Sequence, residues 1–180
     1  MKPPCERFER VVLGAWGWLN DARTRTEHFN RNGPSGPATW VLTQGRNIPQ
    51  GAIEVSDGLY ICRAYHEGGR QIGKASPRLK KGAAIGYKHD EIDVETYEIL
   101  LGDMSGLRWV PARGKVNVSS LGHRPVEGGN EDDGSPLYVV QALYKGTVYP
   151  GKASEKLDGA YIPYDGTEKN VKEYRVLCYN

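Results

Sequence analysis

Two lysines occur in the same short phrase at two places in the chain. Lys74 and Lys152 each stand in a Gly-Lys-Ala-Ser phrase, and each phrase follows a run that opens on Leu-Tyr. A lysine ammonium offers three hydrogen-bond donors and no acceptor, and an adjacent glycine lets a ligand or a backbone approach closely. The pattern indicates either a group that binds hydroxyls or a carboxylate, or a solvated lysine at a structural turn that duplication has preserved.

Carboxylates at matching places supply acceptors for such a ligand. Asp57 stands two residues before the first Leu-Tyr pair, and Asp133 matches it before the second pair once a two-residue insertion is allowed for. Glu91 and Glu168 also match, each four residues after a tyrosine. An ionised carboxylate only accepts hydrogen bonds and can hold two vicinal hydroxyls, which suits a sugar. The alternatives are an Asp-Gly turn for Asp57 and exposed charges at strand ends for the glutamates.

Tyr87 and Tyr164 are the tyrosines that precede these glutamates. An aromatic ring offers a flat face against which the C–H face of a sugar can pack, although core tyrosines would leave the same pattern. Each site would join an Asp and a Lys to a Glu and a Tyr from the same copy or from the partner copy. The candidate sugar-binding residues are Asp57, Lys74, Tyr87, Glu91, Asp133, Lys152, Tyr164 and Glu168.

The sequence carries none of the common catalytic signatures. It contains no Gly-x-Ser-x-Gly elbow, phosphate-binding glycine loop or His-Glu-x-x-His helix, and its four histidines do not recur between the copies. Glu91 and Glu168 could form the carboxylate pair of a glycosidase, but we expect no enzymatic activity and no catalytic residue. The three cysteines lack metal spacing, and the acidic loop at 127–133 lacks the ligand spacing of a calcium loop, so neither a cofactor nor a metal is expected.

Composition restricts the partners. The net charge is only +2, without a basic run between aromatics, so no nucleic-acid partner is expected. No apolar stretch approaches the roughly 20 residues of a membrane span, and the N-terminal charges do not fit a secretory signal. We expect a cytoplasmic protein with reduced thiols, for which non-classical release stays open.

The elements that must position the candidate residues come in two copies. Gly82–Leu100 matches Gly159–Leu177, and Trp40–Arg46 matches Trp109–Lys115. The second copy carries a longer acidic loop, Glu127–Pro136. The predicted division is a helical extension with a linker at 1–38, a first repeat at 39–104 and a second repeat at 105–180.

The strand signals within each copy are short and closely spaced. Runs such as GLYICRAY and PLYVVQAL are rich in β-branched and aromatic residues, and EGGR and YKGT look like hairpin turns. This pattern predicts an all-β fold of the sandwich or barrel-like kind. One copy is too small to bury both faces of its sheet. We therefore expect the two copies to pack around a pseudo-twofold axis, with exchanged strands as one option.

The N-terminal segment follows a different period. Apolar residues from Phe8 to Leu19 recur at helical spacing, which predicts a short amphipathic helix from about Glu6 to Ala22. Asn30–Ala38 has the composition of a linker. The helix either covers an exposed edge of the β core or mediates self-association or membrane contact. The mixed charges beside it weaken the membrane option.

The repeated phrases resemble the DM-nine (DM9) repeat over residues 40–180, with both copies in tandem. The second copy carries the resemblance through Leu-Tyr-Val, Pro-Gly-Lys and Tyr-x-Pro-Tyr-x-Gly-x-Glu. The first copy departs from it, with Ile72 and Gly86 in place of prolines and KHDE in place of DGTE.

This resemblance implies an all-β tandem fold and calcium-independent binding of mannose, as in pattern-recognition lectins that tend to dimerise. It also implies that Asp57 with Lys74, and Asp133 with Lys152, contact the sugar. The expected function is therefore that of a lectin for mannose or mannose-rich glycans, and the expected state is a homodimer. The alternative is a structural or protein-interaction β module that binds no sugar.

Overall fold

The structure, a computed structural model, describes residues 4–180, with side chains from residue 14 onward. Within this range the chain forms one α-helix, α1 (Pro4–Asn32), followed by fourteen strands and two short 3-10 helices. The first half holds β1 (Ala38–Gln44), β2 (Glu54–Ser56), β3 (Leu59–His66), β4 (Gly69–Ala75), β5 (Ala83–Tyr87), β6 (Asp90–Val94) and β7 (Thr96–Gly102). The second half holds η1 (Met104–Gly106), β8 (Leu107–Arg113), η2 (Val118–Ser120), β9 (Gly129–Asn130), β10 (Pro136–Tyr144), β11 (Thr147–Ala153), β12 (Ala160–Tyr164), β13 (Thr167–Val171) and β14 (Glu173–Tyr179).

The two halves repeat one strand order. From the outer edge inward, the first half runs β1-β7-β3-β4-β5-β6 and the second half runs β8-β14-β10-β11-β12-β13. The halves join where β6 pairs with β13. The register repeats as well, because Lys74 faces Ile61 across β3 and β4 as Lys152 faces Val139 across β10 and β11. This arrangement confirms the predicted all-β fold of two pseudo-symmetric repeats.

Eight of the strands close into a ring. Neighbours along it are β4, β5, β6, β13, β12, β11, β10 and β9, and β9 returns to β4 through Asn130 and Arg70. Because β9 belongs to the longer acidic loop, that loop completes the ring. On the other side, β2 reaches β11 through a 2.7 Å hydrogen bond from Ser56 Oγ to Val148 O. Of the two predicted forms, sandwich and barrel-like, the chain therefore adopts the barrel-like one.

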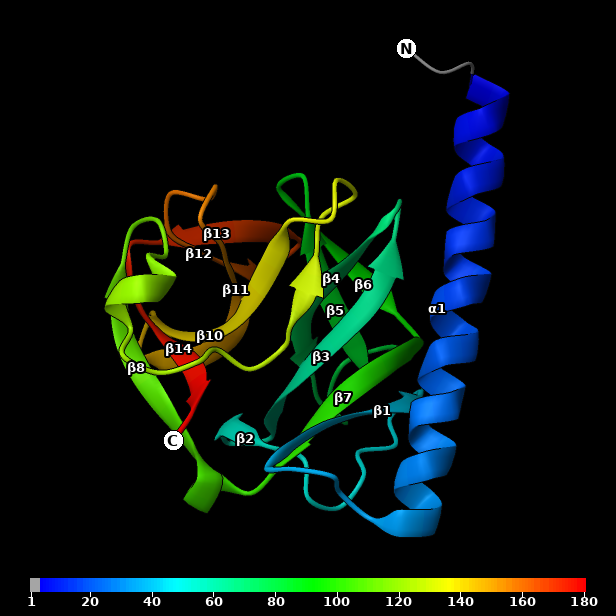
Figure 1. The fold of residues 1–180 in the computed structure, drawn as a ribbon. Coiled ribbons are helices and arrows are strands. Elements are labelled where there is room, and N and C mark those ends of the chain that lie inside the picture. The colour runs from blue at the N-terminus through cyan, green and yellow to red at the C-terminus, as the bar shows by residue number, and fades with distance from the viewer. Residues whose placement is uncertain (1–3) are drawn as a thin grey trace.

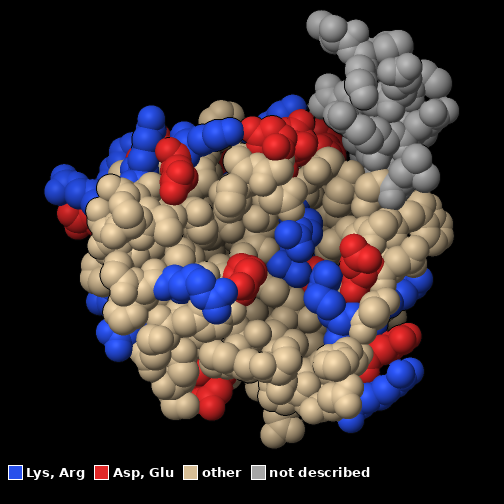
Figure 2. Space-filling view, in the orientation of Figure 1, with Lys and Arg blue, Asp and Glu red and all other residues tan. Residues whose placement is uncertain are grey.

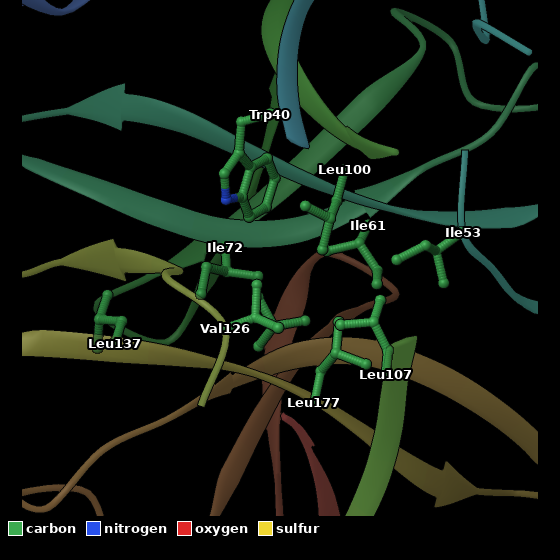
Figure 3. Close-up of a cluster of buried hydrophobic side chains, with 10 residues drawn as sticks. Trp40, Ile53, Ile61, Ile72, Leu100, Leu107, Val126, Leu137 and Leu177 are labelled. Carbon is green, nitrogen blue, oxygen red and sulfur yellow. The ribbon is translucent and has the colours of Figure 1, made fainter. Parts of the chain in front are cut away.

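The main hydrophobic core lies between the two halves, and its side chains point toward one another in Figure 3. Its buried members are Trp40, Ile53, Ile61, Ile72, Leu100, Leu107, Val126, Leu137, Val139 and Leu177. Burial of one large aliphatic side chain contributes about 1.5–3 kcal/mol. Since each half supplies part of this cluster, each half depends on the other for its stability.

The helix α1 runs along one side of the β body (Figure 1). It ends at Asn32 rather than near Ala22, so the predicted linker begins inside the helix. The backbone N–H of Leu42, in the outer strand β1, donates a 2.7 Å hydrogen bond to Thr26 Oγ1. The helix thus covers an edge of the β core, which was the first of the two interpretations. The apolar positions at residues 8–12 lie outside the described side chains, and within residues 4–180 no helix is long and apolar enough to cross a membrane.

A buried charged cluster ties α1 to the sheet. Glu98 in β7 is 0 % exposed and lies 3.0 Å from Arg63 Nε and 3.0 Å from Arg25 Nη2 of the helix. Trp18 Nε1 also donates to Glu98 Oε1 at 2.8 Å. Burial alone would raise the pKa of Glu98, but the charge and hydrogen bonds of Arg63, with those of Arg25 and Trp18, lower it. The carboxylate therefore stays ionised and fixes the helix against the first half.

Candidate functional site

Lys152 lies where the two halves meet, and it is only 4 % exposed. Its Nζ donates to Gln71 Oε1 at 2.6 Å and to Gly86 O at 2.8 Å, and it lies 3.1 Å from Glu168 Oε1. The ammonium thus donates two hydrogen bonds to acceptors of the first half and forms an ion pair with Glu168 of its own half. A buried charge needs such partners, because its desolvation is otherwise unfavourable by several kcal/mol.

The glycine of each Gly-Lys phrase lets neighbouring strands come close. A Cβ at Gly73 would collide with the carbonyl group of Ala84, and a Cβ at Gly151 would collide with that of Tyr161. These glycines therefore allow a neighbouring backbone, rather than a ligand, to come close. They allow the lysine that follows each of them to sit inside the barrel-like body.

Gly86 accounts for one departure of the first copy from the repeated motif. A Cβ there would lie 2.8 Å from Glu168 Cγ and closer still to Oε1. A larger residue would displace Glu168 from Lys152. The second copy has Pro163 at the matching position, so the glutamates of the two sites are seated differently.

A pocket of about 330 Å³ opens onto the Lys152–Glu168 pair. This volume falls in the range of small-ligand sites, about 300–1,000 Å³. Its lining comes from the β5–β6 turn, the acidic loop and β11 to β13, and consists of Tyr87, Lys88, His89, Glu131, Asp132, Lys152, Leu157, Tyr161 and Glu168. Both halves therefore contribute to one site that offers ammonium donors, carboxylate acceptors and tyrosine rings.

The turn between β5 and β6 departs from ordinary turn chemistry. Lys88 and His89 have φ angles of 47° and 73°, the left-handed conformation that a two-residue hairpin turn requires. Asp-Gly meets this requirement at little strain, and the second copy has Asp165 and Gly166 there. The first copy instead holds two long side chains in this position, and both line the pocket. Backbone strain of this kind gathers at functional sites.

Two adjacent aspartates of the acidic loop have different surroundings. Asp132 lines the pocket. Asp133 accepts hydrogen bonds from Lys156 Nζ at 2.8 Å and from the Ser135 hydroxyl at 2.6 Å. These bonds hold the pKa of Asp133 well below its usual range. The structure thus places Asp132, rather than the sequence-predicted Asp133, in one pocket with Lys152.

Lys74 occupies the matching place in the other site. It is 7 % exposed, and its Nζ lies 2.9 Å from Glu91 Oε2. The ring centroid of Tyr149 lies 5.8 Å from this ammonium, and Tyr164 meets Tyr149 edge-on at 5.5 Å between centroids. The surroundings of Lys74 are thus aromatic, whereas those of the pocket described above are polar. Asp57 is not part of them, because its side chain is 100 % exposed and its nearest ionic contact is Arg78, at 3.8 Å.

Each site keeps a buried carboxylate oxygen that lacks a directed hydrogen bond. Within the described side chains these atoms are Glu91 Oε2 and Glu168 Oε1, both of which face a lysine. The other oxygen of Glu168 accepts a 3.1 Å hydrogen bond from the backbone N–H of His89. Both oxygens are buried and lie 2.9 Å and 3.1 Å from a lysine ammonium, so the charge of that lysine is what compensates each of them.

The structure brings together the matched lysines and glutamates that the sequence singled out, with Tyr87 at one site and Tyr164 near the other. It does not bring Asp57 to Lys74. The site residues that sequence reasoning missed are Gln71, Lys88, His89, Glu131, Asp132, Tyr149, Leu157 and Tyr161. Of these residues, only Lys88 and His89 could have been identified from the sequence, because their KHDE turn departs from the Asp-Gly pattern of the other copy.

The fold and the site define a tandem β module with a buried lysine–glutamate pair in each half. Residues 54–171 match the DM9 repeat, and the chain belongs to this family, which has carbohydrate-binding members. The crystal structure of the nematode sperm cell motility protein MFP2B is similar, with a TM-score of 0.59 and 18 % identity. The match covers 83 % of this chain and 50 % of that one, and at this identity it shows the fold alone. The search of curated proteins found no match.

Proposed function

We propose that the protein is a calcium-independent lectin that binds mannose or mannose-rich glycans in pattern recognition. The observation that carries the proposal is the pocket over the Lys152–Glu168 pair, whose lining supplies donors, acceptors and aromatic faces together. Membership of a family with carbohydrate-binding members supports it.

The chemistry of each side chain sets its role in this proposal. Glu168 and Asp132 accept hydrogen bonds from sugar hydroxyls, and the ammonium of Lys88 donates to a sugar oxygen. Tyr87 offers its ring to the C–H face of the sugar. Lys152 holds Glu168 in place and contacts the sugar only by exchanging one of its protein acceptors. Each polar contact contributes about 1 kcal/mol after water is displaced, so a single site binds weakly.

The site around Lys74 is the weaker member of the pair in this proposal. Glu91 supplies an acceptor, and Tyr149 and Tyr164 supply aromatic faces. A sugar there would be held more by packing than by hydrogen bonds. Two unequal sites per chain, doubled in the proposed homodimer, raise the avidity for a branched glycan.

Charge does not favour a nucleic-acid partner. On the face in Figure 2, basic and acidic side chains are interspersed over a largely uncharged surface. Nucleic-acid sites need a continuous basic stripe or patch. A neutral ligand such as a glycan suits this face better.

Isothermal titration calorimetry with methyl α-mannoside, in buffer containing EDTA, tests the proposal. The wild type should bind the mannoside without calcium, and the double variant Lys74→Ala with Lys152→Ala should lose binding. Glu168→Gln, which keeps the shape and removes the charge, provides a second variant in case the double variant unfolds. A wild type that binds no mannoside, or folded variants with unchanged affinity, would contradict the proposal. A glycan array then gives the specificity.

A structural module that binds no sugar is the second candidate, and one observation favours it. The ammonium of Lys152 already has two protein acceptors and a protein counter-charge, as a purely structural charge would. This candidate predicts a folded protein that binds no glycan on the array. A glycosidase gains less support, because Glu91 and Glu168 pair with different lysines. Release of product from mannosides would show such an activity.

A further inference from the structure

A second hollow, which we call the helix groove, lies between α1 and the β3–β4 hairpin. Its volume is about 510 Å³, and it is lined by Ala15, Trp16, Trp18, Leu19, Tyr65, His66, Glu67 and Thr96. Trp16, one of the lining residues, is 58 % exposed, which is unusual for a tryptophan. An exposed aromatic surface of this kind often marks a binding site.

The groove has a fixed shape. Trp18 is held by the 2.8 Å hydrogen bond from its indole Nε1 to Glu98. A Cβ at Gly14 would lie 2.9 Å from Tyr65 Cζ and closer still to its hydroxyl. The absence of a side chain at Gly14 therefore lets α1 approach β3 at this point. Both walls of the groove are positioned by contacts that exist before any ligand arrives.

The helix groove adjoins the pocket over Lys152 through one contact between their linings. His66 lines the groove, and its ring meets the ring of Tyr87 edge-on, with 4.8 Å between centroids. Tyr87 in turn lines the pocket. A single pair of rings thus separates the two hollows. Burial lowers the pKa of His66, and the charges of Lys152 and Lys88 add to this effect against the opposing charge of Glu67, which favours the neutral imidazole.

We propose that the pocket and the helix groove form one extended site for a linear mannose oligosaccharide, an inference that rests on the proposed function. One sugar unit occupies the pocket, the next crosses the His66–Tyr87 ridge, and a later unit packs its C–H face on Trp16. Glu67, at the same groove, accepts a hydroxyl of the crossing unit. A glycan chain fits this path because it alternates apolar faces with hydroxyl rims, as the path alternates rings with carboxylates.

Calorimetry with methyl α-mannoside and with linear mannotetraose tests the extended site. The wild type should bind the tetrasaccharide roughly tenfold more tightly than the monosaccharide, since stacking on an exposed aromatic ring adds to the contacts in the pocket. Trp16→Ala should abolish this gain and leave the monosaccharide affinity unchanged. Leu143→Ala is the matched control, because Leu143 is the comparably exposed apolar residue, at 64 %, on the second half.

The outcomes separate the two proposals. Equal affinity of the wild type for both sugars, or a gain that survives in Trp16→Ala, overturns the extended site and leaves the lectin proposal standing. Failure of both sugars to bind overturns both. If Trp16→Ala instead changes the molecular mass in size-exclusion chromatography with light scattering and leaves the sugar gain intact, the groove is an interface between copies and the extended site is wrong.

Discussion

The side-chain oxygen of Gln71, in the first half, accepts a 2.6 Å hydrogen bond from the ammonium of Lys152 in the second half. The nitrogen of the same amide donates to Glu131 Oε2 at 3.1 Å. Gln71 is fully buried and so links the lysine to the acidic loop that forms one side of the pocket. The pocket is therefore a product of packing the two halves together, and neither copy contains it alone.

Removal of this link should weaken both stability and sugar binding. Gln71→Leu leaves one donor of Lys152 and one oxygen of Glu131 without a partner. An unsatisfied buried polar group costs about 1–3 kcal/mol, so the free energy of unfolding in urea should fall by that amount. Mannoside affinity should fall too, because Glu131 is no longer held at the pocket. A Gln71→Leu protein as stable as the wild type would show that Lys152 finds another acceptor easily.

Gly86→Ala should disturb the site through one methyl group. The new Cβ would overlap Glu168 and push its carboxylate from Lys152. Overpacking of this kind typically costs about 1–3 kcal/mol, and mannoside binding should weaken with it. Gly17→Ala is the control, since a Cβ there meets no atom within 4 Å, and alanine should stabilise the helix by about 1 kcal/mol. Chemical denaturation of both variants checks the contrast.

The Lys88–His89 turn predicts a trade between stability and function. Replacement by Asn-Gly (K88N with H89G) gives the turn its preferred residues and should raise the free energy of unfolding by about 1 kcal/mol. The same change removes two side chains from the pocket and should weaken the mannoside affinity several-fold. Higher stability with unchanged binding would remove Lys88 and His89 from the sugar site.

Glu98 predicts a specific loss of stability in acid. Because its pKa in the folded protein is lowered from 4.5, its contribution is fully present above about pH 4.5 and is lost as the pH falls through the lowered pKa. Glu98→Gln should lack this part of the acid dependence. It should also destabilise the protein at pH 7 by about 3–5 kcal/mol, because Arg63 would stay buried without its counter-charge. Urea denaturation between pH 3 and pH 7, a range that spans the ordinary pKa of a glutamate carboxyl, measures both effects, and parallel curves for the two proteins would contradict this role.

The barrel-like fold and the lysine–glutamate pairs could be predicted from the repeat, because residues that match between two copies of a sequence occupy equivalent positions in the fold. Which of Asp132 and Asp133 lines the pocket could not be predicted from the sequence. It depends on which neighbour binds Lys156, and an insertion blurs the alignment there. Gln71 was missed because its partner lies 81 residues away in the other half.

The end of α1 shows a second limit of sequence reasoning. Apolar periodicity stops near Ala22, but the helix continues to Asn32. The later turns are held by polar contacts with the sheet, from Arg25 to Glu98 and from Leu42 N to Thr26, together with one apolar residue, Phe29, that packs against the core. Such contacts leave no apolar pattern in the sequence, so the helix was predicted too short.

The central claim is that the pocket over Lys152 and Glu168 binds the sugar, and two neighbouring aspartates test it most directly. Mannoside titration should show Asp132→Asn weakened by roughly five- to tenfold, the loss of one charge-assisted contact of about 1–1.5 kcal/mol. Asp133→Asn should bind like the wild type, because Asp133 lies outside the pocket lining and serves an exposed pair with Lys156. Unchanged binding in Asp132→Asn, or a larger loss in Asp133→Asn, would contradict the account.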